Sequence, residues 1–357
     1  MPAPRRASMR FRWTSRCDVS DCCTLRRRSL GALAGAMVGA LPGALLLVAG
    51  DTARAAAMAE FEPVSVPVRP IRVSERVYMV QGDVAPASAV NQGFNANAGF
   101  VITRDGVVVF DALGTPALGA ALVASIRRLT DAPIRRVVVS HYHADHFYGL
   151  QAFKAAGAEV WAHAFARNYL ASEAPALRLA ERRESLFPWV NELTRIIPPD
   201  ITIDRETRFE VGGVGFGLIP VGPAHTPEDL MMVVEDEAVL FAGDLIFAGR
   251  IPFVGDADSR AWLAALDRMA RRPPTTIVTG HGPYSRDGKA DLDLTRDYLR
   301  VLRTEMARAV EEMLEFNEAY AQADWSRFKS LPAFDAANRR NAFNTFVLME
   351  REALSRR

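Results

Sequence analysis

From Ile71 onward, short hydrophobic runs alternate with turn-forming residues, which is the pattern of β-strands joined by tight turns. The segments IRVSERVYMVQG (71–82) and AGFVITRDGVVVFDALG (98–114) predict strands, and the Arg104–Gly106 turn inside the second segment predicts a hairpin. The next segment, TPALGAALVASIRRL (115–129), spaces its apolar residues as a helix does. The pattern therefore indicates strands and helices in the same domain.

The rest of the chain repeats this mixture. Strands are predicted at 135–140 (RRVVVS), 158–163, 201–221, 230–247 and 275–282, and helices at 149–157 and within 164–195. Two wholly helical segments follow, at 290–322 and 335–354. One continuous block of this kind predicts a single large α/β or α+β domain over residues 56–357, with 288–357 as a helical extension.

The first 55 residues depart from this pattern. Residues 1–29 contain eight arginines, and they lead into an uncharged, small-residue stretch (29–50) that precedes small-x-small cleavage sites at Ala53–Ala57. These features predict an export signal over residues 1–55 and a periplasmic location. The RRRSLG run (26–31) is similar to a twin-arginine signal, and the Sec route is the alternative. A membrane anchor is the competing interpretation, which the glycines and Pro42 disfavour.

Composition and charge narrow the function classes. All three cysteines lie within residues 1–55, so the exported chain has no thiol for a disulfide, a nucleophile or a metal ligand. Nine arginines but only three acidic residues lie there too, so the remainder of a chain with net charge +1 is mildly acidic. We therefore expect a small-molecule substrate, no nucleic-acid partner and no stable membrane anchor after cleavage; the oligomeric state stays open.

The segment SHYHADHFYG (140–149) holds half of the six histidines of the chain. His141 and His143 are two positions apart, so an extended backbone turns both rings to the same side, where they can share one metal ion. Asp145 and His146 follow as the backbone turns, which makes a second metal beside the first plausible. The alternative is that the histidines gather in a loop by chance. If they bind metal instead, residues from distant parts of the chain must supply the remaining ligands.

Such ligand-type residues do recur just after predicted strands. Asp111 follows VVVF, His141 follows VVVS, His225 follows GLIPVGPA, Asp244 follows VLFAG and His281 follows TIVTG. Loops at strand ends are where a rigid sheet presents ligands from distant parts of a chain. We expect these five positions to converge.

At these positions the sequence resembles the metallo-β-lactamase-fold hydrolase superfamily. Its His-x-His-x-Asp-His signature matches HYHADH (141–146), and the match continues in order through PAHTPED, FAGDLIF and TGHG, with VVVFDALG upstream. The resemblance implies an α+β fold, a four-layer αββα sandwich with the metals at the edge of the sheets. It also implies a zinc-dependent hydrolase with two zinc ions, with iron or manganese as alternatives.

The resemblance assigns roles to individual residues. His141, His143 and His225 would bind the first zinc ion, Asp145, His146 and His281 the second, and Asp244 would bridge both. Asp145 would also be catalytic, orienting the attacking hydroxide and assisting proton transfer to the leaving group. Asp111 would hold the histidine-rich loop in place, or would simply cap a helix.

The remaining candidates are less specific. His163 is expected to be a partly buried histidine without a metal. Phe94, Tyr142, Phe187, Trp189 and Phe253 could line a substrate pocket, although most such residues belong to the core. Arg250 could meet a substrate anion, with a solvated side chain as the commoner outcome.

The function predicted is hydrolysis of an ester, thioester or lactone-like bond by a metal-bridging hydroxide. Asp244 stands where the best-known antibiotic-degrading branches have Cys or Ser, so β-lactam hydrolysis is a secondary alternative. Further alternatives are a mononuclear iron enzyme similar to persulfide dioxygenases and a non-catalytic metal-binding module. The motifs look most like periplasmic zinc hydrolases associated with sulfur oxidation or quinoprotein dehydrogenase systems.

Overall fold

The structure is a computed structural model that describes residues 61–271 and 273–355. The described residues belong to one compact unit, Ala56–Arg357. The predicted export signal (1–55) lies outside the described residues and stays a prediction. Within the described residues, no helix has the length and hydrophobicity needed to cross a membrane.

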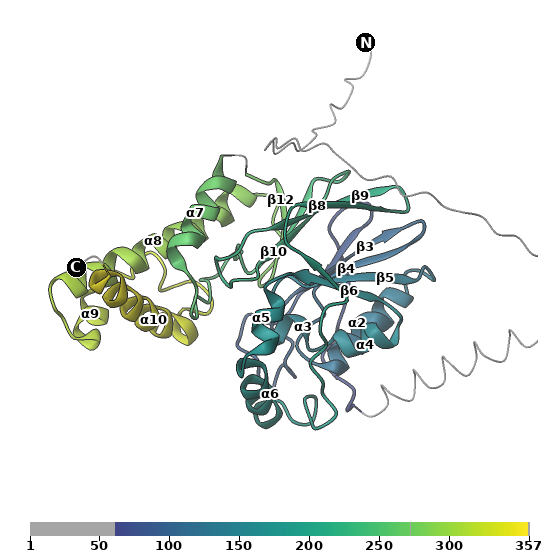
Figure 1. Cartoon of the computed structure of the whole chain (residues 1–357), viewed down its shortest axis with the longest axis horizontal. Coiled ribbons are helices and arrows are strands. Elements are labelled where there is room, and N and C mark those ends of the chain that lie inside the picture. Colours follow the sequence, from purple (N-terminus) through teal and green to yellow (C-terminus); the bar gives the residue numbers. More distant parts are fainter. Residues whose placement is uncertain (1–60, 272, 356–357) are drawn as a thin grey trace, which may run out of the picture. The chain divides into compact units, whose positions relative to one another are not determined.

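The first sheet has seven strands whose spatial order follows the chain (Figure 1). They are β1 (Ile71–Arg72), β2 (Val77–Val80), β3 (Ala98–Thr103), β4 (Gly106–Phe110), β5 (Ile134–Val138), β6 (Glu159–His163) and β7 (Ile201–Ile203). Strands β1 to β4 pair antiparallel, and β4 to β7 pair parallel. The β3–β4 pair, in register Thr103 to Gly106, is the predicted hairpin.

The second sheet has five strands in the order β12-β11-β10-β9-β8. They are β8 (Thr207–Val211), β9 (Val214–Pro220), β10 (Leu230–Val234), β11 (Val239–Gly243) and β12 (Thr276–Thr279). The first four pair antiparallel, and β12 adds parallel to β11. Strands β10 and β11 are buried along their whole length, which explains their continuous apolar sequence.

Helices lie outside the two sheets, and the last two helices of the chain pack against another helix and extend away from the sheets (Figure 1). Those of the first half are α2 (Pro116–Arg127), α3 (Ala144–Phe147), α4 (Leu150–Ala155), α5 (Ala166–Ala171) and α6 (Ala174–Ser185). Those of the second half are α7 (Ser259–Ala270), α8 (Gly288–Glu311), α9 (Phe316–Gln322) and α10 (Phe334–Leu354). Three hydrophobic clusters fill the three interfaces between four layers. The predicted αββα sandwich with a C-terminal helical extension is confirmed.

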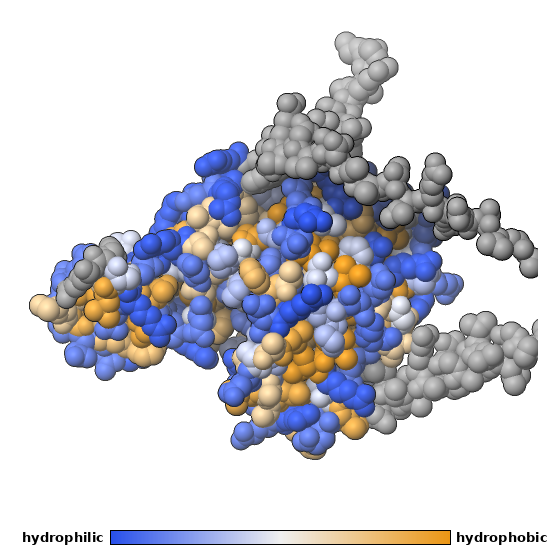
Figure 2. All heavy atoms as spheres, viewed as in Figure 1, coloured by the Kyte–Doolittle hydropathy of each residue, from blue (hydrophilic) through white to orange (hydrophobic). Residues whose placement is uncertain are grey.

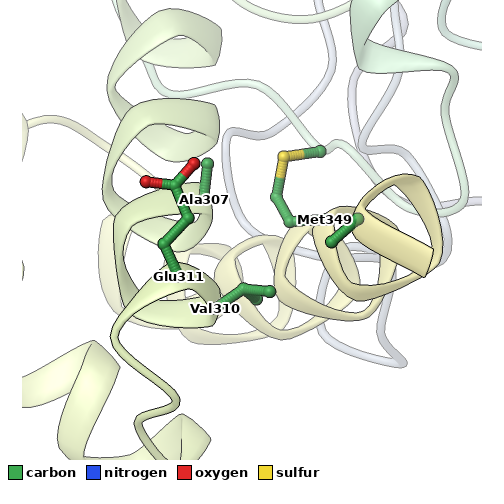
Figure 3. A pocket seen from close by; sticks show the side chains of 5 residues that line it. Ala307, Val310, Glu311 and Met349 are labelled. Carbon is green, nitrogen blue, oxygen red and sulfur yellow. The ribbon is translucent and has the colours of Figure 1, made fainter. Parts of the chain in front are cut away.

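The helical extension differs from the prediction in one detail. The predicted helix at 290–322 is broken, because Met313 has a φ of 55° and the chain turns between α8 and α9. Helix α10 packs along α8, and a small pocket between them is lined by Ala307, Val310, Glu311 and Met349 (Figure 3). The face seen in Figure 2 mixes hydrophilic and apolar areas. Phe165 and Leu177, at α5 and α6, are exposed apolar residues.

Candidate metal centre

The polar residues that follow five strands meet at one edge of the sandwich. Strands β4 and β5 are parallel, so Asp111 and His141, which follow them, lie at the same edge of the first sheet. Strands β9, β11 and β12 all run in one direction in the second sheet, and His225, Asp244 and His281 follow them. The side chains of all five are buried. The expected convergence is observed.

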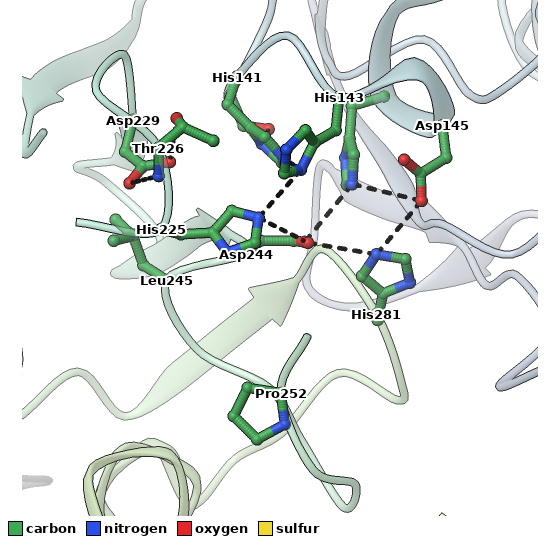
Figure 4. Close-up of polar contacts among 12 residues, drawn as sticks. His141, His143, Asp145, His225, Thr226, Asp229, Asp244, Leu245, Pro252 and His281 are labelled. Atoms are coloured by element: carbon green, nitrogen blue, oxygen red, sulfur yellow. Dashed lines mark hydrogen bonds and ion pairs between the residues drawn. The ribbon is translucent and has the colours of Figure 1, made fainter. Parts of the chain in front are cut away.

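Seven side chains present their ligand atoms in two adjacent groups (Figure 4). One group is His141, His143, His225 and Asp244, and the other is Asp145, His146 and His281; within each group the ligand atoms lie within 4.8 Å of one another. In the first group, His143 Nδ1 is 3.0 Å from His141 Nε2 and 3.1 Å from His225 Nε2. These are the two groups that the sequence predicted.

Asp244 reaches both groups. Its Oδ2 lies 3.5 Å from His225 Nε2 in the first group and 3.3 Å from His281 Nε2 in the second. Its Oδ1 lies 3.4 Å from His146 Nε2. Oδ2 therefore lies between the two groups, which is the placement that a carboxylate needs to bridge two cations.

Hydrogen bonds on the outer side of three rings determine where their lone pairs point. His146 Nδ1 is 2.9 Å from Asp111 Oδ2, and His281 Nδ1 is 2.7 Å from the Asn95 carbonyl oxygen. Ser140 Oγ donates to Asp111 Oδ2 and so accepts from His141 Nδ1, at 2.9 Å. Each Nδ1 is therefore protonated, and each Nε2 lone pair faces the centre, as metal-binding histidines require.

The electrostatics also favour cations here. Burial lowers the pKa of His146, but the carboxylates of Asp244, Asp111 and Asp145 outweigh burial and raise it to about 10, so a metal ion at Nε2 would displace a proton from this ring. Burial lowers the pKa of His225 to about 3 despite Asp244, so this ring is a neutral ligand. Among the described residues, the buried atoms His146 Nε2 and Asp244 Oδ1 have no hydrogen-bond partner. A metal ion would satisfy both atoms.

The donor set fits the expected metals. Five imidazole nitrogens and two carboxylates are ligands that suit zinc, and iron and manganese accept the same ligands. Gly280 leaves space for the Asp244 carboxylate, because a Cβ atom at position 280 would lie 2.0 Å from Asp244 Oδ1. Asp111 has a φ of 63°, a strained conformation that aims its carboxylate at Ser140 and His146.

Two residues of the site were not identified from the sequence. Asn95 Nδ2 donates to Asp145 Oδ2 at 2.8 Å, while the Asn95 carbonyl oxygen orients His281. Ser140 links Asp111 to His141 through its hydroxyl, and its backbone N–H donates to Asp111 Oδ1. Ser140 adjoins the histidine cluster and could have been noticed there. Asn95 is 50 positions from Asp145, so no local pattern connects them.

The expected pocket aromatics need correction. Tyr142 is fully buried in the core beside Phe147, and its hydroxyl donates to the Ile197 carbonyl oxygen, so it does not line a pocket. Phe94 belongs to the same core cluster. Phe187 is 69% exposed on the surface, and Trp189 is partly buried in the loop after α6.

Other aromatic rings contact the metal-binding candidates instead. Trp262 lies 5.2 Å from His225, and Phe247 stacks on His281 at 5.7 Å, both measured between ring centroids. Phe253, which was among the expected residues, contacts the ring of His143 edge-on at 6.5 Å. His163 lies outside both ligand groups and accepts a hydrogen bond from the Phe165 backbone N–H, as expected.

Arg250 is buried rather than solvated, with 8% of its surface exposed. Its guanidinium donates to the Val84 and Ile251 carbonyl oxygens and lies 5.9 Å from the centroid of the Phe247 ring. Burial lowers its pKa, while the carboxylates of Asp244 and Asp145 oppose that change. In the described part of the chain, no carboxylate lies within ion-pair distance of Arg250.

The comparisons with known proteins agree with this geometry. Residues 91–281 match the family described as the metallo-beta-lactamase superfamily, and they make up more than half of the chain. The chain belongs to the metallo-β-lactamase superfamily. The matched region contains every residue of the two ligand groups.

Several relatives in this superfamily are similar over part of the chain. A linear primary-alkylsulfatase of Pseudomonas sp. is 21% identical over 249 residues, which are 60% of this chain and 47% of that protein. Metallo-beta-lactamase IND-1 of Chryseobacterium indologenes is 21% identical over 203 residues, 56% of this chain and 76% of that protein. The chain thus spans about half the length of the alkylsulfatase.

Solved structures show the same fold. The inverting sec-alkylsulfatase Pisa1 from Pseudomonas sp. has a TM-score of 0.62 at 18% identity, covering 78% of this chain and 50% of that one. A metallo-beta-lactamase from Pontibacter korlensis has a TM-score of 0.50 at 20% identity, covering 66% of this chain and 99% of that one. Two kinds of hydrolase thus share this sandwich.

Proposed function

We propose that this metallo-β-lactamase superfamily member is a two-metal hydrolase that cleaves an ester, thioester or lactone bond of a small molecule. The observation that carries the proposal is Asp244, whose carboxylate lies within 3.5 Å of histidine nitrogens from both ligand groups. His141, His143 and His225 hold one metal, and Asp145, His146 and His281 hold the other. Zinc is the metal we propose for both positions.

Zinc bound at these residues would lower the pKa of water, so that a nucleophile forms at neutral pH, and would stabilise negative charge on the attacked oxygen. Asp145 is the residue we assign to proton handling. Nearby cationic groups outweigh burial and hold its pKa well below the usual range, so the carboxylate is ionised. Asn95 fixes one of its oxygens by a 2.8 Å hydrogen bond. The carboxylate can then orient the nucleophile, accept the proton that the nucleophile gives up and pass that proton to the leaving group.

The test is a substrate panel with the purified, zinc-loaded protein. It compares S-lactoylglutathione, acyl thioesters, lactones, a chromogenic cephalosporin and bis-nitrophenyl phosphate. Hydrolysis of a carbonyl substrate is expected, with turnover reduced about 100- to 10,000-fold in Asp145→Asn. The matched control is Asp204→Asn, which neutralises a carboxylate whose side chain is 69% exposed. Full activity in Asp145→Asn would refute the assigned role, and inactivity on every substrate would favour a non-catalytic metal-binding module.

Arg250 favours a second candidate, the hydrolysis of an anionic sulfate ester. A buried guanidinium without a carboxylate partner is costly unless another anion pairs with it. The partly buried Phe253, whose ring contacts His143, can also contact an apolar chain. Release of sulfate from a medium-chain alkyl sulfate, measured in the same panel, would favour this candidate over carbonyl hydrolysis.

We also propose that the enzyme is exported to the periplasm. The support is the arginine-rich start, the uncharged stretch and the cleavage sites within residues 1–57. Cell fractionation with N-terminal sequencing of the mature protein tests this. A mature N-terminus near residue 56 in the periplasmic fraction is expected, and an intact cytoplasmic chain would contradict it.

A further inference from the structure

The segment between β11 and α7, here called the 245–257 loop, forms one wall of the metal centre. It carries Phe247, whose ring stacks on His281, and Phe253, whose ring edge contacts His143. It also carries the buried Arg250. The position of this loop therefore determines what a substrate meets beside the metals.

Helix α10, almost 90 positions further along the chain, holds the backbone of this loop. Asn341 Oδ1 accepts from the Val254 N–H at 2.9 Å, and Asn341 Nδ2 donates to the Pro252 carbonyl oxygen at 2.8 Å. One helical turn on, Asn344 Nδ2 donates to the Gly255 carbonyl oxygen at 2.8 Å. In the view of Figure 4, Pro252 lies below Asp244 and His281, whereas His141 and His143 lie above them.

Helix α8 supports the same arrangement. Tyr298, which is fully buried, receives a 2.9 Å hydrogen bond from Asn341 Nδ2 at its hydroxyl. Thr295, also on α8, accepts from the Phe247 N–H at 3.1 Å through Oγ1. The two helices of the extension thus contact both ends of the loop.

These contacts have a clear physical reason. The loop belongs to neither a strand nor a helix, and a buried backbone polar group without a partner costs about 1–3 kcal/mol. An apolar residue at position 341 would leave the Val254 N–H and the Pro252 carbonyl oxygen unpaired. The fully buried Asn341 amide therefore serves the loop in addition to its bond to Tyr298 on α8.

We infer that Asn341 is a positioning residue through which the helical extension places Arg250 and Phe253 beside the metal centre and so takes part in substrate selection. It does not touch the reacting atoms. The effect on selection rests on the proposed function, while the placement of the loop does not.

The test compares Asn341→Leu with Asn338→Leu in the full-length, zinc-loaded protein. Asn338 is equally buried on α10 but bonds only to Tyr298 and Tyr320 within the extension, so its loss is a matched control for a buried amide. We expect Asn341→Leu to speed amide hydrogen exchange in residues 247–257 at least about tenfold. We also expect it to raise KM about tenfold with a smaller change in kcat and unchanged zinc content. Asn338→Leu is expected to change neither the hydrogen exchange of residues 247–257 nor KM to this extent.

Equal exchange in the two variants, or an equal change in KM, would overturn the inference. If Asn341→Leu fails to fold, Asn344→Ala removes only the bond to the Gly255 carbonyl oxygen and must show the same pattern on a smaller scale. If the wild-type enzyme hydrolyses no substrate of the panel, the proposed function fails. Hydrogen exchange in the 245–257 loop still decides whether Asn341 positions it.

Discussion

Two loops border the metal centre, and they are held in different ways. The histidine loop (residues 140–146) follows β5 and contributes four of the seven candidate ligands. Its outer partners are Asp111, at the end of the neighbouring strand β4, and Asn95. The 245–257 loop begins just after Asp244 and is fixed by amides of α10, 87 positions away for the Val254–Asn341 pair.

The two loops therefore differ in which part of the fold holds the metal ligands and which part holds the residues proposed to select the substrate. The histidine loop is held by Asp111, at the end of its own sheet, and by the Leu230 N–H of the second sheet, which donates to the Ser140 carbonyl oxygen, so its geometry depends on the two sheets. The 245–257 loop is held by a helical extension outside the matched family region of 91–281. Changes in the extension can therefore alter what binds without disturbing the metal ligands.

Loss of the bridging carboxylate should have the largest effect. In Asp244→Ala, both ligand groups lose a member, so we expect zinc content to fall and turnover to drop by more than about 100-fold, the upper range for changes to outer ligand partners. Metal analysis and the rate on the best panel substrate measure this. A variant with two zinc ions and normal turnover would show that Asp244 does not bridge.

Asp111→Asn weakens the histidine loop alone. The Asp111 carboxylate orients His146 and, through Ser140, His141, so we expect zinc affinity to fall about 10- to 100-fold. Chelator competition measures the affinity, and Asp204→Asn is the control. The ratio of the rates on different substrates should stay constant. A changed ratio would show that the histidine loop also takes part in substrate selection.

Arg250→Ala changes the other loop. We expect KM for an anionic ester to rise about 10- to 100-fold, because a charge-assisted hydrogen bond contributes about 1.5–3 kcal/mol. KM for a neutral ester and the zinc content should not change. Arg205→Ala, which removes a side chain that is 85% exposed, is the control. Equal losses on anionic and neutral esters would contradict the anion-binding role.

The smallest effect concerns pH and the loop that carries His225. Burial raises the pKa of Asp229 to about 8, although hydrogen bonds from Thr226 oppose this. The folded chain keeps a proton that the unfolded chain releases above its ordinary pKa near 4. The free energy of unfolding should therefore decline as pH rises from about 4 to about 8, with no further decline above that range.

Asp229→Asn should remove this decline. Urea unfolding at constant saturating zinc across that pH range measures it for both proteins. Parallel pH profiles for the wild type and the variant would show that Asp229 is ionised in the folded state.

The sequence predicted what is local and periodic. His141, His143, Asp145 and His146 lie within six positions, and the ends of apolar runs located His225, Asp244 and His281, because parallel strands present their carboxyl ends at one edge. The hairpin and the helices of the extension followed from their residue periodicities.

What the sequence did not predict depends on tertiary contacts. Burial of Tyr142 and Arg250 depends on elements that pack over them, and a sequence shows neither. Asn95 and Asn341 act on residues 50 and 87 positions away. A polar side chain in a helical or turn-like segment usually faces solvent, so their roles had no local signal.

The central claim is a centre for two metal ions bridged by Asp244. Its most direct test is the metal-to-protein ratio of the purified mature protein, measured by inductively coupled plasma mass spectrometry for wild type and Asp244→Ala. We predict two zinc ions per chain in the wild type and clearly fewer in the variant. One metal ion or fewer per wild-type chain, or iron alone, would contradict the account.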